Sequence, residues 1–79
     1  MDDARYWLVA GGYWWGRGAT KDEALREARR HTGEEKGFEK TERHAVWRVH
    51  PETYVNGMGQ MVSPDDAADP EKVSSHRPA

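Results

Sequence analysis

Histidine, the residue type in this chain best suited to hold a metal ion or to move a proton, occurs four times. His44 and His50 would share one face of a predicted strand, but they stand six residues apart, roughly 20 Å at about 3.3 Å per residue. One zinc ion cannot be held by two ligands at that separation. His31 ends a predicted helix, and His76 lies in the C-terminal tail. We therefore predict no metal centre and no cofactor.

Acidic side chains, which could serve as general acids or bases, concentrate on the predicted helix and the segment after it, where they alternate with basic ones. The spacings of Asp22–Arg26, Glu23–Arg26 and Glu27–Arg30 are those of ion pairs on a helix surface. A small domain with one helix also offers little room for a substrate pocket. We expect a protein that is not an enzyme.

The segment 11–18 (GGYWWGRG) is rich in glycine and precedes the helix, as phosphate-binding loops do. The Gly-Lys-Ser/Thr sequence and the second strand–helix unit of such a loop are missing. The glycines are expected instead to form a hairpin turn and the exit from a strand.

The aromatic residues near the N-terminus give the strongest indication of function. Five of the eight aromatic side chains fall within the first fifteen residues: Tyr6, Trp7, Tyr13, Trp14 and Trp15. They flank Gly11-Gly12, a pattern typical of a hairpin. Neighbouring residues of a strand point to opposite faces, and one helix covers only one of them, so we predict that some rings are exposed for binding. Packing of all the rings in the core stays an alternative, because aliphatic residues are few.

Three arginines, Arg26, Arg29 and Arg30, form a basic face of the predicted helix that could contact phosphates or an acidic protein surface. A solvated, ion-paired stripe is the alternative interpretation. The predicted partner-binding residues are Tyr13, Trp14, Trp15, Arg17, Arg26, Arg29, Arg30 and Trp47.

Turn signals and periodicity predict the elements that position these residues. Strands are expected over residues 5–10 and 13–17, followed by a helix over 21–32 that begins with a capping box. The alternating segment 43–50 predicts a half-buried strand. Residues 53–62 contain Asn56-Gly57, typical of a type I′ turn, and form a small hairpin or one bent strand.

The order of these elements predicts an α+β fold, a two-layer ββαββ arrangement with an antiparallel sheet and one helix packed on one face. Residues 1–62 form the single domain. Residues 63–79 lack apolar periodicity and are expected to be a disordered, polar and acidic tail. Ten basic and ten acidic side chains balance within 1–62, whereas the tail holds two basic and four acidic ones.

Composition narrows the class of protein further. The chain has no cysteine and no apolar run near eighteen residues, so we expect no disulfide, signal peptide or membrane span and a cytoplasmic location. Because the folded part is neutral, we predict a protein partner in preference to nucleic acid. A homodimer formed through a sheet edge or an aromatic face stays open.

Two family resemblances add to these inferences. The run Gly18-Ala19-Thr20-Lys21-Asp22-Glu23-Ala24-Leu25-Arg26-Glu27-Ala28 resembles the strand-to-helix passage of HicB-like antitoxins, which neutralise small RNA-cleaving toxins. In outline, residues 4–62 resemble small phage-encoded anti-CRISPR proteins: a short chain without cysteine, a sheet with one helix and a polar tail. That resemblance implies inhibition of a type I CRISPR-Cas effector complex by binding to its subunits.

We therefore predict a small non-enzymatic binding protein, an anti-CRISPR inhibitor of phage origin that acts in the host cytoplasm. The alternatives are a single-stranded nucleic-acid-binding module that uses the same rings, and a HicB-like antitoxin.

Overall fold

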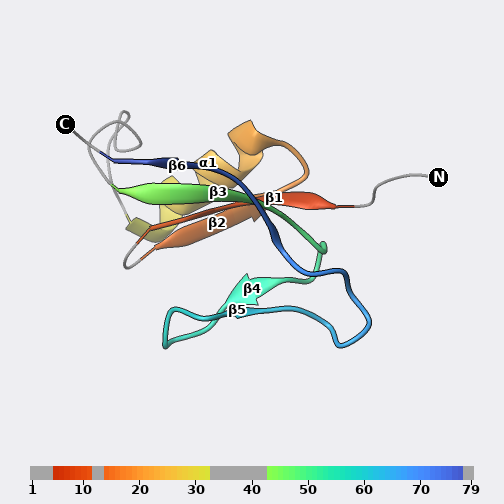
Figure 1. The fold of residues 1–79 in the computed structure, drawn as a ribbon. Coiled ribbons are helices and arrows are strands. Elements are labelled where there is room, and N and C mark those ends of the chain that lie inside the picture. The colour runs from red at the N-terminus through yellow and green to blue at the C-terminus, as the bar shows by residue number, and fades with distance from the viewer. Residues whose placement is uncertain (1–4, 12–13, 33–42, 78–79) are drawn as a thin grey trace.

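The computed structural model describes residues 5–11, 14–32 and 43–77. In chain order the elements are β1 (Tyr6–Ala10), β2 (Trp15–Gly18), α1 (Lys21–Thr32), β3 (His44–Val49), β4 (Tyr54–Val55), β5 (Met61–Val62) and β6 (Glu71–His76). Four strands form an antiparallel sheet in the order β2-β1-β3-β6, and β4 pairs with β5 in a second, two-stranded sheet. Figure 1 shows α1 on one side of the main sheet and the β4–β5 hairpin on the other. The predicted α+β class is confirmed.

The register of the main sheet assigns its side chains to two faces. Residues directly opposite each other in an antiparallel pair point to the same side. Val9 lies opposite Val46, and both belong to the core cluster that packs on α1. Leu8 lies opposite Trp47 and points the other way. We name these two sides the helix face, which carries Val9 and Val46, and the hairpin face, which carries Leu8 and Trp47.

Helix α1 begins at the predicted capping box and spans the predicted residues. The Glu23 amide donates to Thr20 Oγ1 at 3.1 Å, and the Glu23 carboxylate accepts the Ala19 N–H at 2.9 Å. The carboxylate therefore reaches the residue before the N-cap instead of the N-cap residue itself. Together the two bonds fix the direction in which the chain enters the helix.

Strand β2 lies very close to α1 because both elements carry small residues at their contact. A Cβ atom added at Gly16 would collide with the backbone of Ala24 and Ala28, and one added at Gly18 would collide with Glu23. Ala24 and Ala28 are fully buried. The helix therefore presents small residues to the sheet. Both glycines serve this contact from within β2, and Gly18 is also the last residue of the strand, at the exit that we expected.

The β4–β5 hairpin covers part of the hairpin face. Leu8, Val49 and Thr53 are fully buried. The Arg17 guanidinium donates to the Thr53 carbonyl, and the Thr53 and Ser63 hydroxyls are 2.8 Å apart and hydrogen-bonded. The expectation that the chain covers only one face of its sheet is therefore wrong, because the segment after β3 folds back beneath it.

The turn of this hairpin also differs from the predicted type I′. A type I′ turn on Asn56-Gly57 needs positive φ at both residues, but among the described residues only Gly59 has a positive φ, 78°. Asn56 Oδ1 accepts the N–H groups of Met58 and Gln60, each at 2.9 Å, and the Gly59 N–H bonds to the Asn56 carbonyl at 3.0 Å. Asn56 closes the loop through its side chain, and Gly59 provides the left-handed residue.

The prediction of a disordered tail is wrong for residues 71–76, which form the outer strand β6 of the main sheet. The pairing with β3 shifts register between Val46 and Trp47. An edge strand is held by backbone pairing on one side only, and five of the six residues of β6 are exposed. Such a strand needs no apolar alternation, so periodicity could not reveal it. The folded unit consequently extends beyond the predicted boundary at residue 62.

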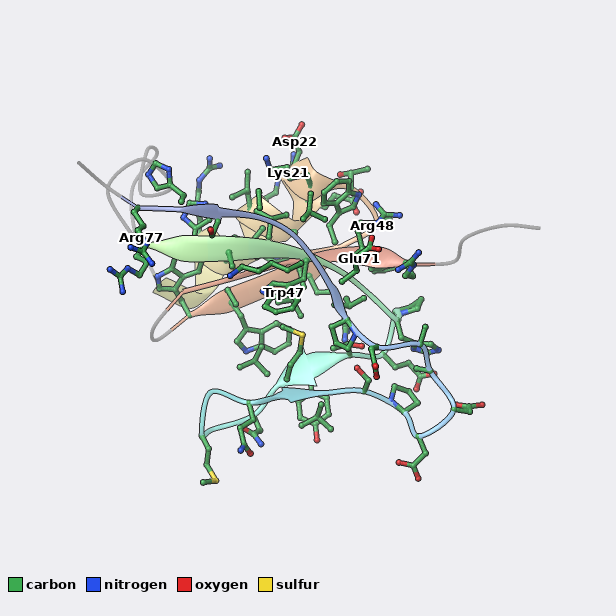
Figure 2. The ribbon with its side chains drawn as sticks, viewed as in Figure 1. Lys21, Asp22, Trp47, Arg48, Glu71 and Arg77 are labelled. Atoms are coloured by element: carbon green, nitrogen blue, oxygen red, sulfur yellow. The ribbon has the colours of Figure 1, made fainter. Side chains whose placement is uncertain are left out.

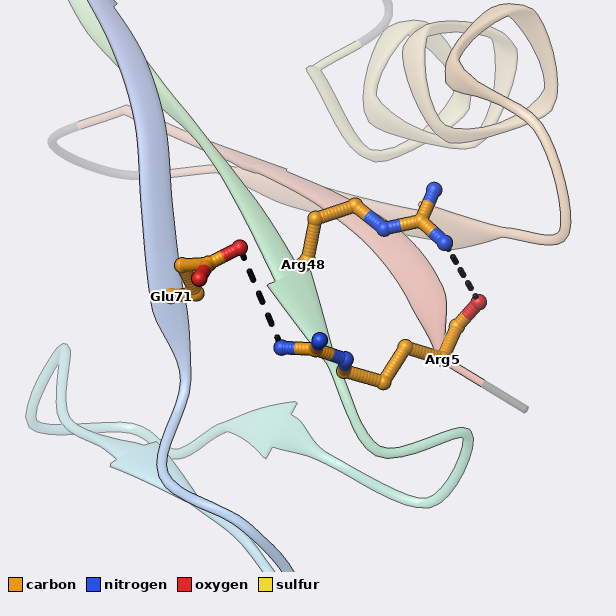
Figure 3. Close-up of polar contacts among 3 residues, drawn as sticks. All are labelled: Arg5, Arg48 and Glu71. Atoms are coloured by element: carbon orange, nitrogen blue, oxygen red, sulfur yellow. Dashed lines mark hydrogen bonds and ion pairs between the residues drawn. The ribbon is translucent and has the colours of Figure 1, made fainter. Parts of the chain in front are cut away.

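A group of polar contacts joins the start of β1 to β3 and β6. Arg5 forms an ion pair with Glu71 at 3.9 Å, and Arg48 donates to the Arg5 carbonyl at 3.3 Å, as Figure 3 shows. The Arg48 guanidinium also lies 4.5 Å from the centre of the Trp7 ring, a cation–π contact. The Arg48 contacts join β3 to β1, and the Arg5–Glu71 pair adds a contact to the backbone pairing that holds β6.

Candidate functional site

Trp14, one of the predicted binding residues, lies in the core. Its side chain is 8% exposed and packs on the helix face with Val9 and Val46. A Cβ atom at Gly11 would collide with the Trp14 indole, and the ring centre of His44 is 5.8 Å away. The structure therefore corrects the expectation that Trp14 contacts a partner. The large ring supplies core volume that the small residues of α1 do not.

Trp15 points to the hairpin face, because it lies opposite Ala10 in the register. The prediction that Trp14 and Trp15 point to opposite faces is thus confirmed. Trp15 is half-buried and lines a hollow of about 360 Å³ together with Gly11, Trp14 and the β4–β5 hairpin residues Val55, Asn56, Gly57 and Gly59. The hollow is therefore formed by two hairpins that are distant in sequence.

The β4–β5 hairpin also carries two exposed apolar side chains that are not among the residues lining this hollow. Met58, at the tip of the β4–β5 hairpin, is 82% exposed, and Tyr54 on β4 is 46% exposed. Neither residue was predicted from the sequence, because residues 53–62 were interpreted only as a turn and its flanking strands. We name the hollow lined by Trp15, Val55 and Asn56, together with the adjoining hairpin tip at Met58, the hairpin surface. Tyr54 lies outside it, because neighbouring residues of a strand point to opposite sides and Val55 is the one that lines the hollow.

Trp47 and Arg17 also occupy the hairpin face, but both are held by contacts within the chain. Trp47 is half-buried, and Figure 2 shows it on the side of the sheet that faces β4 and β5. The Lys72 ammonium lies 5.9 Å from the centre of the Trp47 ring. Arg17 holds the hairpin through the Thr53 carbonyl. Tyr13, the remaining aromatic residue of the predicted site, lies outside the described residues.

The arginines of α1 occupy a different place from the tryptophans. Arg26 and Arg30 are exposed and line a hollow of about 380 Å³ with Tyr6 and Arg17, while Arg29 is half-buried. The same hollow is lined by the carboxylates of Glu23 and Glu27. Glu27 pairs with Arg30 at 3.0 Å, as the helical spacing predicted. The structure thus brings Arg17, Arg26 and Arg30 together around one hollow, but the surface there carries both positive and negative side chains.

A third hollow, of about 330 Å³, lies at the end of β3 and β6 and contains none of the predicted site residues. Its described lining includes the exposed cations Arg43, Lys72 and Arg77 and the histidines His44 and His76. Sequence analysis could not find this hollow, because it treated half of these residues as a disordered tail. Figure 2 shows Arg77 at the opposite end of the sheet from Arg48 and Glu71.

The two histidines of this hollow lie opposite each other in the register, with ring centres 5.1 Å apart. Within 5–11, 14–32 and 43–77, no group of three or more histidines and carboxylates could hold a metal ion. No helix in this part of the chain is long and apolar enough to cross a membrane.

Comparison with known proteins finds no match: no family model fits the chain, and neither a curated protein nor a solved structure matches it. The candidate sites are therefore interpreted from the residues of this chain alone.

Proposed function

We propose that this chain is a non-enzymatic binding protein that recognises a protein partner through the hairpin surface. The observation that carries the proposal is the hollow beside Trp15, next to the hairpin tip where Met58 is 82% exposed between the lining residues Gly57 and Gly59. Aromatic residues and methionine are enriched at protein interfaces. A partner side chain could enter the hollow while Met58, at the adjoining hairpin tip, packs against the partner beside it.

The hairpin surface suits protein binding because it combines a firm base with an adaptable tip. Trp15 lies on a strand of the main sheet, and Asn56 fixes the loop by accepting the Met58 and Gln60 amides. Binding to a surface that is ordered in advance costs less conformational entropy. Methionine has three rotatable bonds and a polarisable sulfur, so Met58 can fit an irregular partner.

The partner that we propose is a subunit of a type I CRISPR-Cas effector, which the chain would inhibit by occlusion in the host cytoplasm. The support is the architectural resemblance to small anti-CRISPR proteins, together with the single-helix α+β fold. Inhibition of this kind needs no chemical step, only a surface that excludes the natural partner or substrate of the complex.

An interference assay tests this function. In bacteria with active type I systems, expression of the chain should raise the transformation efficiency of a targeted plasmid to that of an untargeted one. The variant Met58→Ala should lose at least about tenfold of this effect, since hot-spot truncation costs about 2 kcal/mol or more. Val73→Ala, an exposed apolar residue on β6, is the matched control and should behave as wild type. If the wild-type chain does not reduce CRISPR interference in any type I subtype, the proposal is contradicted.

A further inference from the structure

The hollow at the end of β3 and β6 has a floor of small residues on the hairpin face. Ala10 lies opposite both Trp15 and Ala45, and Ala45 lies opposite Ser75. These four residues form one row across β2, β1, β3 and β6, about 14 Å wide at roughly 4.8 Å per strand. Small side chains in the middle of the row leave the sheet surface accessible, and the Ser75 hydroxyl lies at its edge.

Cations surround this floor. Arg43, Lys72 and Arg77 are all exposed, and no acidic side chain is among the described residues that line the hollow. Lys72 belongs to the next row of the same face, opposite Trp47, and its ammonium stays near that ring. The chain as a whole carries a formal charge of −2, so this concentration of positive charge is local.

The acidic residues of the described segment 63–77 are not among those that line the hollow. Asp65, Asp66 and Asp69 belong to the segment between β5 and β6, which Figure 1 shows at the other end of the main sheet from residue 77. Glu71 is paired with Arg5 at that same distant end. Within residues 63–77, Arg77 thus lies at the end of the sheet away from the acidic side chains, and Glu71, the neighbour of Lys72, is paired with Arg5.

We propose that this basic hollow binds a phosphate group, carried either by a small phosphorylated molecule or by the backbone of a single-stranded nucleic acid. Two guanidinium groups, an ammonium and a hydroxyl match the several acceptor oxygens of a phosphate. A volume of about 330 Å³ falls at the low end of ligand pockets. The cations of this hollow lie outside the β4–β5 hairpin, so they can be substituted without changing Met58, although Gly11 lines both hollows.

The test titrates the full chain with pyrophosphate and, separately, with an eight-nucleotide oligothymidylate at low salt, by calorimetry. The variant Lys72→Gln/Arg77→Gln should weaken binding at least about tenfold, because each charge-assisted hydrogen bond contributes substantially. The control variant Lys21→Gln removes a positive charge from an exposed position on α1 outside all three hollows and should bind as wild type. Circular dichroism confirms that both variants are folded.

The two ligands distinguish the source of the phosphate. Tighter binding of the oligonucleotide, with a salt slope reduced by about 1.4 in the Lys72→Gln/Arg77→Gln variant, identifies a nucleic-acid backbone. Pyrophosphate binding without oligonucleotide binding identifies a small phosphorylated ligand. The proposal would be overturned if neither pyrophosphate nor the oligonucleotide binds, or if the control variant weakens binding as much as Lys72→Gln/Arg77→Gln does.

Discussion

At the scale of single residues, Trp14 and Trp15 show how neighbours with the same chemistry take different roles. Trp14 is packed between the sheet and α1, whereas Trp15 lines the hollow beside the β4–β5 hairpin. The alternation of a strand sends one ring into the core and leaves the other to form a surface. Sequence alone predicts that the rings diverge, but not which of the two faces the helix.

The contrast predicts different outcomes for two substitutions. Trp14→Ala should cost about 3–5 kcal/mol of unfolding free energy, a large part of the stability of a domain of this size. Trp15→Ala should cost less and leave a folded protein that binds its partner weakly. Urea unfolding followed by circular dichroism measures both. Equal destabilisation by the two variants would show that Trp15 is also a core residue.

At the scale of elements, the contact between β2 and α1 depends on the absence of a side chain at Gly16. A Cβ atom there meets the backbone of Ala24 and Ala28, which cannot move aside as a flexible side chain could. Gly16→Ala should therefore destabilise the fold by about 1–3 kcal/mol. Gly57 has nothing within 4 Å of an added Cβ, so Gly57→Ala is the matched control and should change stability by less than about 0.5 kcal/mol. A neutral Gly16→Ala, measured by urea unfolding, would contradict this packing.

The outer strand β6 gives a second prediction at this scale. Because β6 pairs with β3 on one side only, alternate amides within 71–76 should be protected from hydrogen exchange, while those of 65–69 exchange fast. Nuclear magnetic resonance of the exchanging protein resolves single amides. Uniformly fast exchange over 63–77 would mean that the tail is disordered, as its composition indicates.

Local signals predicted much of this architecture. The capping box at Thr20–Glu23 and the alternation of 43–50 identified α1 and β3, because both patterns arise from contacts close in sequence. The cover over Leu8 and the place of β6 depend on pairings distant in sequence. Pairings of this kind produce no periodic pattern of apolar residues in the sequence. The predicted site was incomplete for the same reason, because Met58, Lys72 and Arg77 belong to these segments.

At the scale of the whole molecule, α1 and the β4–β5 hairpin cover opposite faces of the main sheet. Both proposed binding surfaces lie on the hairpin face, beside the part that the β4–β5 hairpin covers. The hairpin surface lies at the edge of the β4–β5 hairpin, and the basic hollow lies on the uncovered end of the same face. A protein of 79 residues can in this way present two chemically different surfaces.

Affinity capture tests most directly whether the hairpin surface binds a protein. Tagged wild type, Met58→Ala and Val73→Ala would be incubated with nuclease-treated lysate of a host carrying a type I system, and the retained proteins identified by mass spectrometry. We expect effector subunits in stoichiometric amounts with wild type and Val73→Ala, and at least about tenfold less with Met58→Ala. Capture of a small toxin instead would indicate an antitoxin. Capture that is unchanged by Met58→Ala, or that is seen only from a parallel lysate without nuclease treatment, would contradict the proposed surface.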